Sequence, residues 1–139
     1  MIKNKHLDYV SHIKSASPNI IWCHLKRQLF TINSDIYLAA VYLPPLQSQR
    51  KAGEDVPSIL EQEIHKYSIQ GKIILLGDFN ARTGTLNDFT ENDCHDFLAT
   101  DDAHNLDKNW PKRNNGDHTV NKLGGEILRL CIGSNLFQR

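Results

Sequence analysis

A short apolar run, Ile73-Ile74-Leu75-Leu76, constrains the fold of this 139-residue chain more than any other feature. The run follows a segment with helical periodicity and ends at Gly77. An unbroken apolar run in this setting is typical of a strand that is buried on both faces of a helix-covered sheet. We therefore predict a strand over residues 72–76 and an α/β arrangement of strand, helix and strand.

The helix before this strand is predicted over residues 56–67, where apolar side chains recur at helical spacing. Asp55 fits the N-cap position, Pro57 fits the first turn, and Gly71 lies beyond the end. These signals at both ends make it the best-defined helix of the chain.

Two further strands are predicted earlier in the chain, at residues 19–25 and 36–43, because both segments are rich in β-forming residues. A turn-like sequence between them favours a hairpin. Pro44-Pro45 ends the second strand, because proline offers no amide N–H to a sheet. Tyr42 is therefore expected close to a strand end.

A last helix is predicted to begin near Asn121 and to end at residues 133–135. Its expected inward-facing residues are Leu123, Ile127, Leu130 and Cys131. The polar, acidic stretch 83–116 is expected to be a long functional loop, and Leu136-Phe137 resembles the opening of a further strand.

Composition excludes several classes of protein. Lys and Arg number 16 and Asp and Glu number 16, so the polybasic coat of many nucleic-acid-binding proteins is absent, although residues 1–51 carry seven basic against two acidic residues. Three separated cysteines support neither a zinc site nor a disulfide-linked partner. The chain shows no signal segment and no apolar run of membrane-spanning length, so we expect no membrane partner and an intracellular location.

The residues with chemical potential follow the predicted strand, in the sequence I-I-L-L-G-D-F-N-A-R-T-G of residues 73–84. Strand alternation would place Asp78 and Asn80 on one side and Phe79 on the other. A carboxylate there can orient a water molecule or help to hold a divalent cation, and an amide can donate to a phosphate oxygen. The structural alternative is that Asp78 opens an Asx-turn and Asn80 only tolerates a left-handed backbone.

The motif G-D-F-N-A-R-T-G after an apolar strand, preceded by V-Y-L-P-P, resembles the endonuclease/exonuclease/phosphatase superfamily. The wording is most similar to the endonuclease domains of non-LTR retrotransposons. The segments I-Y-L-A-A-V-Y-L-P-P and T-V-N-K-L-G-G-E-I-L-R-L-C extend the likeness over nearly the whole chain.

The resemblance implies a DNase I-like α/β fold, in which two sheets form a sandwich flanked by helices, and a Mg²⁺-dependent hydrolase that cleaves phosphodiesters in DNA. Asp78 matches the family's water-activating aspartate and is a weak candidate Mg²⁺ ligand. Asn80 matches its phosphate-binding asparagine and Tyr42 its phosphate-contacting tyrosine. Arg82 can approach backbone phosphates, although an exposed loop arginine is equally ordinary. A DNA substrate makes the nucleus a candidate compartment.

The chain has no counterpart of the family's metal-binding glutamate or of its aspartate-histidine pair. Asp117-His118 precedes the last helix and is interpreted as a loop dipeptide, and Glu61 and Glu63 are expected on the solvated face of a helix. Residues 1–139 are therefore interpreted as a single, incomplete domain. We expect the isolated chain to be inactive or very weak as an enzyme.

The sequence also allows two other functions. In the first, the chain is an inactive remnant that binds nucleic acid or a partner chain through its basic residues 1–51. Alternatively it can act on a lipid or sugar phosphate, because loops choose the substrate in a shared fold.

Overall fold

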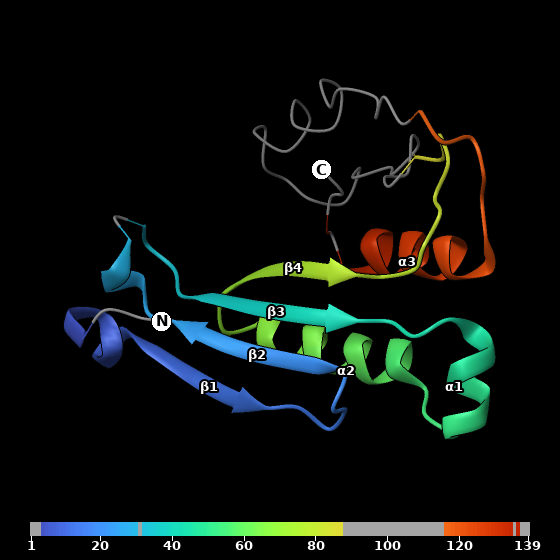
Figure 1. Cartoon of the computed structure of the whole chain (residues 1–139). Coiled ribbons are helices and arrows are strands. Elements are labelled where there is room, and N and C mark those ends of the chain that lie inside the picture. Colours follow the sequence, from blue (N-terminus) through green and yellow to red (C-terminus); the bar gives the residue numbers. More distant parts are fainter. Residues whose placement is uncertain (1–3, 31, 88–115, 135, 137–139) are drawn as a thin grey trace. The chain divides into compact units, whose positions relative to one another are not determined.

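The computed structural model describes residues 4–30, 32–87, 116–134 and 136. The chain divides into two compact units, Met1–Ala81 and Arg82–Arg139, and each is described by itself. The fold is mixed α/β, with one four-stranded sheet and several helices among the described residues (Figure 1). Residues 88–115 of the predicted acidic loop, and Phe137 of the predicted last strand, lie outside the described residues.

The first unit is built on a four-stranded sheet in the order β1-β2-β3-β4. Its strands are β1 (Val10–Lys14), β2 (Ile20–Leu25), β3 (Ile36–Tyr42) and β4 (Lys72–Asp78). β1, β2 and β3 are antiparallel neighbours, whereas β4 joins β3 in parallel. The pairing of β2 with β3 confirms the predicted hairpin, and the connection also holds a short 3₁₀-helix, η2 (Arg27–Leu29).

Two elements at the start of the chain were not expected from the sequence. The 3₁₀-helix η1 (Asn4–Tyr9) leads directly into β1. β1 has only a weak alternation of exposed and half-buried side chains, so its pairing with β2 rather than its own pattern defines it as a strand.

The crossover between β3 and β4 contains two helices, α1 (Leu46–Ala52) and α2 (Val56–Ser68). The sequence did not predict α1, which begins directly after the two prolines that end β3. α2 is the predicted helix: the Asp55 carboxylate accepts a hydrogen bond from the Ser58 backbone N–H at 3.2 Å, which confirms the N-cap.

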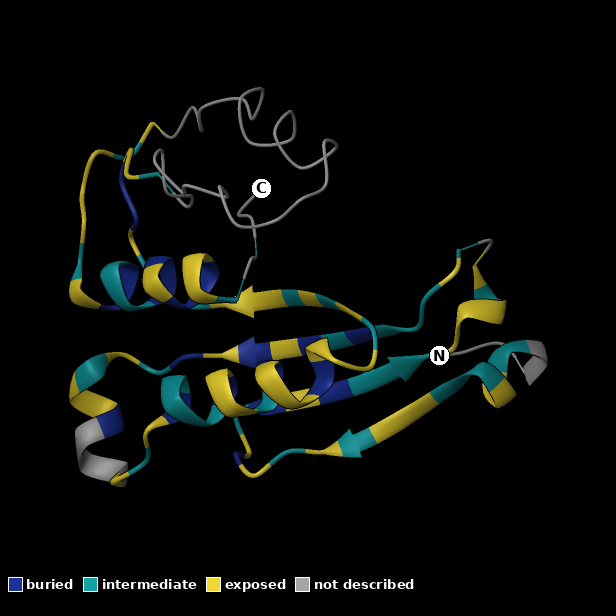
Figure 2. Ribbon diagram, turned by 180° about the vertical axis from the view of Figure 1, so that it is seen from behind, coloured by how far each residue is buried: buried dark blue, intermediate teal, exposed yellow. Residues whose placement is uncertain are grey.

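The core of this unit lies between α2 and one face of the sheet, which α2 covers in Figure 2. Alternate strand residues point to this face. The buried residues on the two sides are Ile20, Trp22, Tyr37, Ala39 and Val41 from the strands, and Val56, Leu60, Ile64 and Tyr67 from α2. Trp22 is completely buried, and its ring centroid lies 4.8 Å from that of Tyr67.

β4 is not buried on both faces, and the prediction that it would be is wrong. Ile74 is 44% exposed and Leu76 is 47% exposed, on the face opposite α2. Exposed and half-buried side chains alternate along β4 because, among the described helices of this unit, α2 covers only one face of the sheet (Figure 2). Local composition alone could not reveal that the second face is open.

The second unit contains α3 (Lys122–Gly133), which confirms the predicted last helix. The Asn121 side-chain oxygen caps it by accepting from the Gly124 N–H at 2.7 Å. The four residues predicted to face inward, Leu123, Ile127, Leu130 and Cys131, are all buried. Leu136 is not in a strand: its N–H donates to the Cys131 carbonyl at 2.8 Å, beyond the end of the helix.

No helix among the described residues combines the length and the apolar character needed to cross a membrane.

Candidate functional site

Two residues of the predicted site, Tyr42 and Asp78, are direct neighbours at one edge of the sheet. They are register partners in the parallel pair β3–β4, and each is the last residue of its strand. Paired residues on adjacent strands share a face, so both side chains lie on the face opposite α2. Tyr42 is 48% exposed and Asp78 is exposed. The carboxyl ends of parallel strands are where α/β sheets bind ligands.

Gly77 allows this close approach of the two strands. Its φ of 142° is a conformation that residues with a Cβ rarely adopt, and a Cβ at this position would collide with the Val41 carbonyl. Glycine is therefore required immediately before Asp78, and its presence in the motif has a structural cause.

Asn80 reaches the site by a turn rather than by strand alternation. β4 ends at Asp78, and Asn80 has a positive φ of 46°. The Asn80 N–H donates to Asp78 Oδ1 at 2.9 Å, which is an Asx-turn. Strand alternation therefore does not position Asn80, because β4 ends before it, whereas the Asx-turn and the left-handed asparagine of the structural alternative are both present.

The same turn is attached to the end of β3 by a second set of hydrogen bonds. Asn80 Nδ2 donates to the Leu43 carbonyl at 2.8 Å, and the Leu43 N–H donates to the Asp78 carbonyl at 2.8 Å. Leu43 is fully buried. These bonds fix the Asn80 amide and the Asp78 backbone relative to Tyr42, so the three residues form one ordered group.

Arg82 belongs to the second unit. Its Nε lies 3.4 Å from Asp117 Oδ2, and both side chains are largely exposed. Asp117 Oδ1 also accepts from the Thr119 N–H at 2.9 Å, and this bond is the main reason why the pKa of the Asp117 carboxyl lies below its ordinary value, with the Arg82 charge adding to it. Asp117 therefore stabilises a local turn, in agreement with its interpretation as a loop residue.

The described residues do not form a complete Mg²⁺ site. Mg²⁺ takes about six oxygen ligands in octahedral geometry. Asp78 is the one carboxylate on β3 or β4 at this edge, since the Glu54 carboxylate accepts hydrogen bonds from Ser17 and Asn19. Among the described residues there is no group of three or more His, Cys, Asp or Glu side chains suited to a metal ion. A metal bound through Asp78 would need further oxygen ligands from outside this set.

Glu63 has a structural role that the sequence did not predict. Instead of lying on a solvated face, its carboxylate accepts from Trp22 Nε1 at 2.8 Å, from Ser15 Oγ at 2.8 and 2.9 Å, and from the Ala16 N–H at 2.9 Å. Glu61, on the same helix, is exposed as expected. A buried tryptophan needs an acceptor for its indole N–H, and that need was the available signal.

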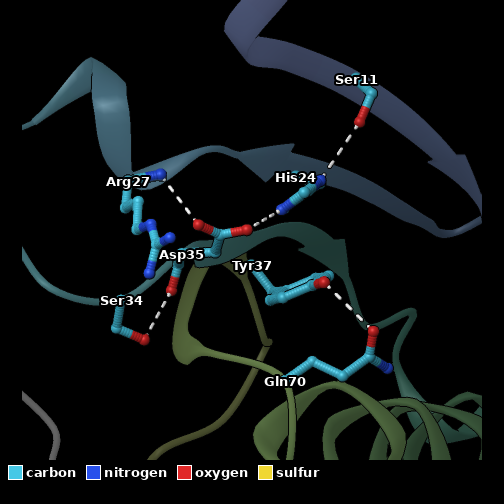
Figure 3. A network of polar contacts seen from close by, with 7 residues as sticks. All are labelled: Ser11, His24, Arg27, Ser34, Asp35, Tyr37 and Gln70. Atoms are coloured by element: carbon cyan, nitrogen blue, oxygen red, sulfur yellow. Dashed lines mark hydrogen bonds and ion pairs between the residues drawn. The ribbon is translucent and has the colours of Figure 1, made fainter.

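A polar network at the opposite end of β3 contains the residue types of a nucleophilic triad (Figure 3). His24 Nε2 lies 2.7 Å from Asp35 Oδ2, whereas Ser11 Oγ lies 3.5 Å from His24 Nδ1, the outer limit of a hydrogen bond. Asp35 Oδ1 also accepts from the Arg27 N–H at 2.9 Å. The close contacts hold η2 against β2 and β3, so this network is a structural clamp.

The aromatic part of the network supports that interpretation. The His24 ring stacks on Tyr37 at a centroid distance of 4.8 Å, and the Tyr37 hydroxyl donates to Gln70 Oε1 at 3.2 Å. Burial raises the pKa of the Tyr37 phenol, and the nearby Asp35 charge adds to the effect. Tyr37 is thus held neutral inside the core.

A surface hollow of about 520 Å³ lies on the connection between β2 and β3. It is lined by Arg27, Gln28, Phe30, Ile32 and Asn33. The hollow precedes β3 in the chain, whereas Tyr42 ends β3, so it is not part of the Tyr42–Asp78 edge. It also contains no carboxylate that could take part in hydrolysis.

Comparisons of the chain with protein-family models, with curated proteins and with solved structures gave no match.

Proposed function

We propose that this chain carries part of a phosphodiester-hydrolysing site of the endonuclease/exonuclease/phosphatase type, with DNA as the substrate, similar to the endonuclease domains of non-LTR retrotransposons. The proposal includes the DNase I-like two-sheet sandwich, of which the four-stranded sheet would be one half. The single observation that carries the proposal is the pairing of Tyr42 with Asp78, with Asn80 tied to the end of β3 beside them.

The proposed roles follow from the groups at this edge. Asp78 presents an exposed carboxylate that can orient a water molecule and accept its proton. The Tyr42 hydroxyl and the Asn80 amide can donate hydrogen bonds to phosphate oxygens without adding charge. Arg82 is retained as a candidate contact to the phosphate backbone.

Mg²⁺ is the cofactor that the resemblance implies, and it would neutralise negative charge on the phosphate during hydrolysis. Because the described residues hold no group of three or more candidate metal ligands, we expect the isolated chain to bind DNA weakly and to hydrolyse it no faster than background. Substrate contact and catalysis therefore have to be measured separately.

The test combines nicking of supercoiled plasmid in Mg²⁺ with DNA binding at low salt, where phosphate contacts are strongest. Asp78→Ala, Asn80→Ala and an EDTA blank serve as controls for nicking. Nicking that both substitutions abolish would show that the missing ligands come from elsewhere, for instance a second chain. Binding that Tyr42→Phe and Asn80→Gly weaken would support substrate contact at this edge. Binding unaffected by them would overturn the proposal and favour a remnant that binds through residues 1–51.

A further inference from the structure

Within the described part of the chain, backbone groups on the outer edge of β4 have no hydrogen-bond partner. β4 is the last strand of the sheet, and its even-numbered residues turn their backbone toward β3: the Lys72 N–H donates to the Asp35 carbonyl at 2.9 Å, and the Asp78 carbonyl accepts from Leu43 at 2.8 Å. Backbone groups alternate in direction along a strand. Ile73, Leu75 and Gly77 therefore direct their N–H and C=O groups outward, where no described residue bonds them. Such an edge is a template for another strand.

The side chains of β4 give this edge a specific pattern. Lys72, Ile74, Leu76 and Asp78 share the face opposite α2, and all four are exposed. A cation stands at one end of the strand, an anion at the other, and two apolar side chains lie between them. Lys72 has no ion-pair partner among the described residues. An antiparallel copy of the same strand would present the opposite order of charges.

One register matches both the backbone and the side chains. With a two-fold axis at Leu75, the outward groups of Ile73 face those of the partner's Gly77, and Leu75 faces the partner's Leu75. Lys72 then lies opposite the partner's Asp78, in a non-hydrogen-bonded pair, where side chains approach most closely. The next register in either direction places Lys72 or Asp78 opposite an apolar side chain, which is less favourable.

We infer that a second copy of this chain docks on β4 in this register and extends the sheet across a two-fold axis. The formal net charge of the chain is zero, so the two copies do not repel each other through net charge. The dimer also places the partner's Lys72 beside the Tyr42–Asp78 pair, which adds a cation to an edge that has none on β3 or β4 at that end. The inference goes beyond the proposed function, and its test needs no nucleic acid.

The first test uses charge reversal and sedimentation equilibrium of the full chain. In a dimer of Lys72→Glu, an acidic side chain at position 72 of each copy lies opposite Asp78 of the other. In a dimer of Asp78→Lys, a basic side chain at position 78 lies opposite Lys72 of the other copy. Each variant alone should therefore dimerise at least ten times more weakly than the wild type. A mixture of the two variants restores opposite charges at both pairs and should recover the dimer. The control is Lys26→Glu, at an exposed position outside the sheet, which should leave the dimer unchanged. A monomeric wild type, or a mixture no better than the single variants, would overturn the inference.

The second test measures the register by disulfide cross-linking. In a background with Cys23, Cys94 and Cys131 replaced by serine, the double variant Ile74→Cys with Leu76→Cys should form covalent dimers under mild oxidation, because positions 74 and 76 face each other across the axis. Ile74→Cys alone should cross-link much more slowly. Equal rates for the single and double variants would contradict this register.

Discussion

The half-buried carboxylate of Glu63 on α2 accepts a hydrogen bond from the indole N–H of Trp22 on β2 at 2.8 Å, and this contact joins the helix to the sheet. Trp22 is completely buried, so its N–H has no access to water. The same carboxylate holds the segment between β1 and β2 through Ser15 and Ala16. One acidic side chain therefore fixes how α2 is seated on the sheet.

Replacement of Glu63 should destabilise the chain because it leaves a buried donor unpaired. We expect Glu63→Ala to lower the free energy of unfolding by about 1–3 kcal/mol, with a smaller loss for Glu63→Gln, which keeps one acceptor oxygen. Urea unfolding followed by tryptophan fluorescence measures the change. The matched control is Glu61→Ala, two residues away and exposed. Equal effects at both positions would contradict the role given to Glu63.

Asp35 should make stability depend on pH. Its pKa is lowered, first by the hydrogen bond from the Arg27 N–H and then by the bond from His24. A carboxyl with a depressed pKa in the folded state contributes stability above its unfolded pKa, and this contribution is lost as the pH falls through the folded value. We expect the difference in unfolding free energy between the wild type and Asp35→Asn to be largest near neutral pH and to shrink below about pH 4. Asp8→Asn, at an exposed site, should show little difference at neutral pH.

Alanine substitutions at the two adjacent glycines of α3, Gly124 and Gly125, should change the stability of the protein in opposite directions. A Cβ at Gly124 would meet the Arg82 carbonyl, whereas a Cβ at Gly125 would meet nothing within 4 Å. We expect Gly124→Ala to destabilise by about 1–3 kcal/mol and Gly125→Ala to stabilise by about 0.5–1 kcal/mol, as is usual for glycine inside a helix. Thermal unfolding of the two variants measures both effects, and the same sign for both would show that α3 does not approach Arg82 in this way.

Replacing Asn80 by alanine and by glycine should distinguish the loss of its side-chain hydrogen bond from the strain of a left-handed backbone. Both Asn80→Ala and Asn80→Gly lose the bond to the Leu43 carbonyl, but alanine keeps a Cβ at a positive φ, whereas glycine has none and adopts this φ without strain. We expect the alanine variant to be less stable than the glycine variant by about 1–2 kcal/mol. Urea unfolding of the pair gives this difference directly. A glycine variant no more stable than alanine would mean that the turn relaxes without strain.

Local signals in the sequence were sufficient for α2, α3 and three of the four strands, but not for α1, η1 or β1. α2 and α3 begin at Asp55 and Asn121, whose side chains cap them as predicted. The end of β3 before Pro44 and the antiparallel pairing of β2 with β3 are also confirmed. These features depend on residues close together in the chain, where capping and proline chemistry act.

The errors concern contacts between distant residues. The apolar run of β4 cannot show that one face is left open, because burial depends on which elements cover the sheet. The helix pattern predicts a solvated Glu63 because it does not show that the Trp22 indole N–H needs an acceptor. Strand alternation does not predict the position of Asn80, because the strand ends two residues earlier.

The sequence identifies the residues of the candidate site, but it does not predict how they are arranged. Tyr42 and Asp78 come from segments separated by two helices, and only the parallel register of β3 and β4 makes them neighbours. Their roles toward a phosphodiester remain a proposal.

The most direct test of that proposal is a titration of the ¹⁵N-labelled chain with a short DNA duplex at low salt, followed by ¹H–¹⁵N NMR. We predict that the resonances of the Asn80 side-chain amide and of the Tyr42 and Asp78 backbone amides shift progressively. Asn80→Gly and Tyr42→Phe should weaken the binding several-fold while the fold is retained. Shifts confined to other residues of the segment 1–51, with no change at Tyr42, Asp78 or Asn80, would contradict a phosphodiester site at this edge.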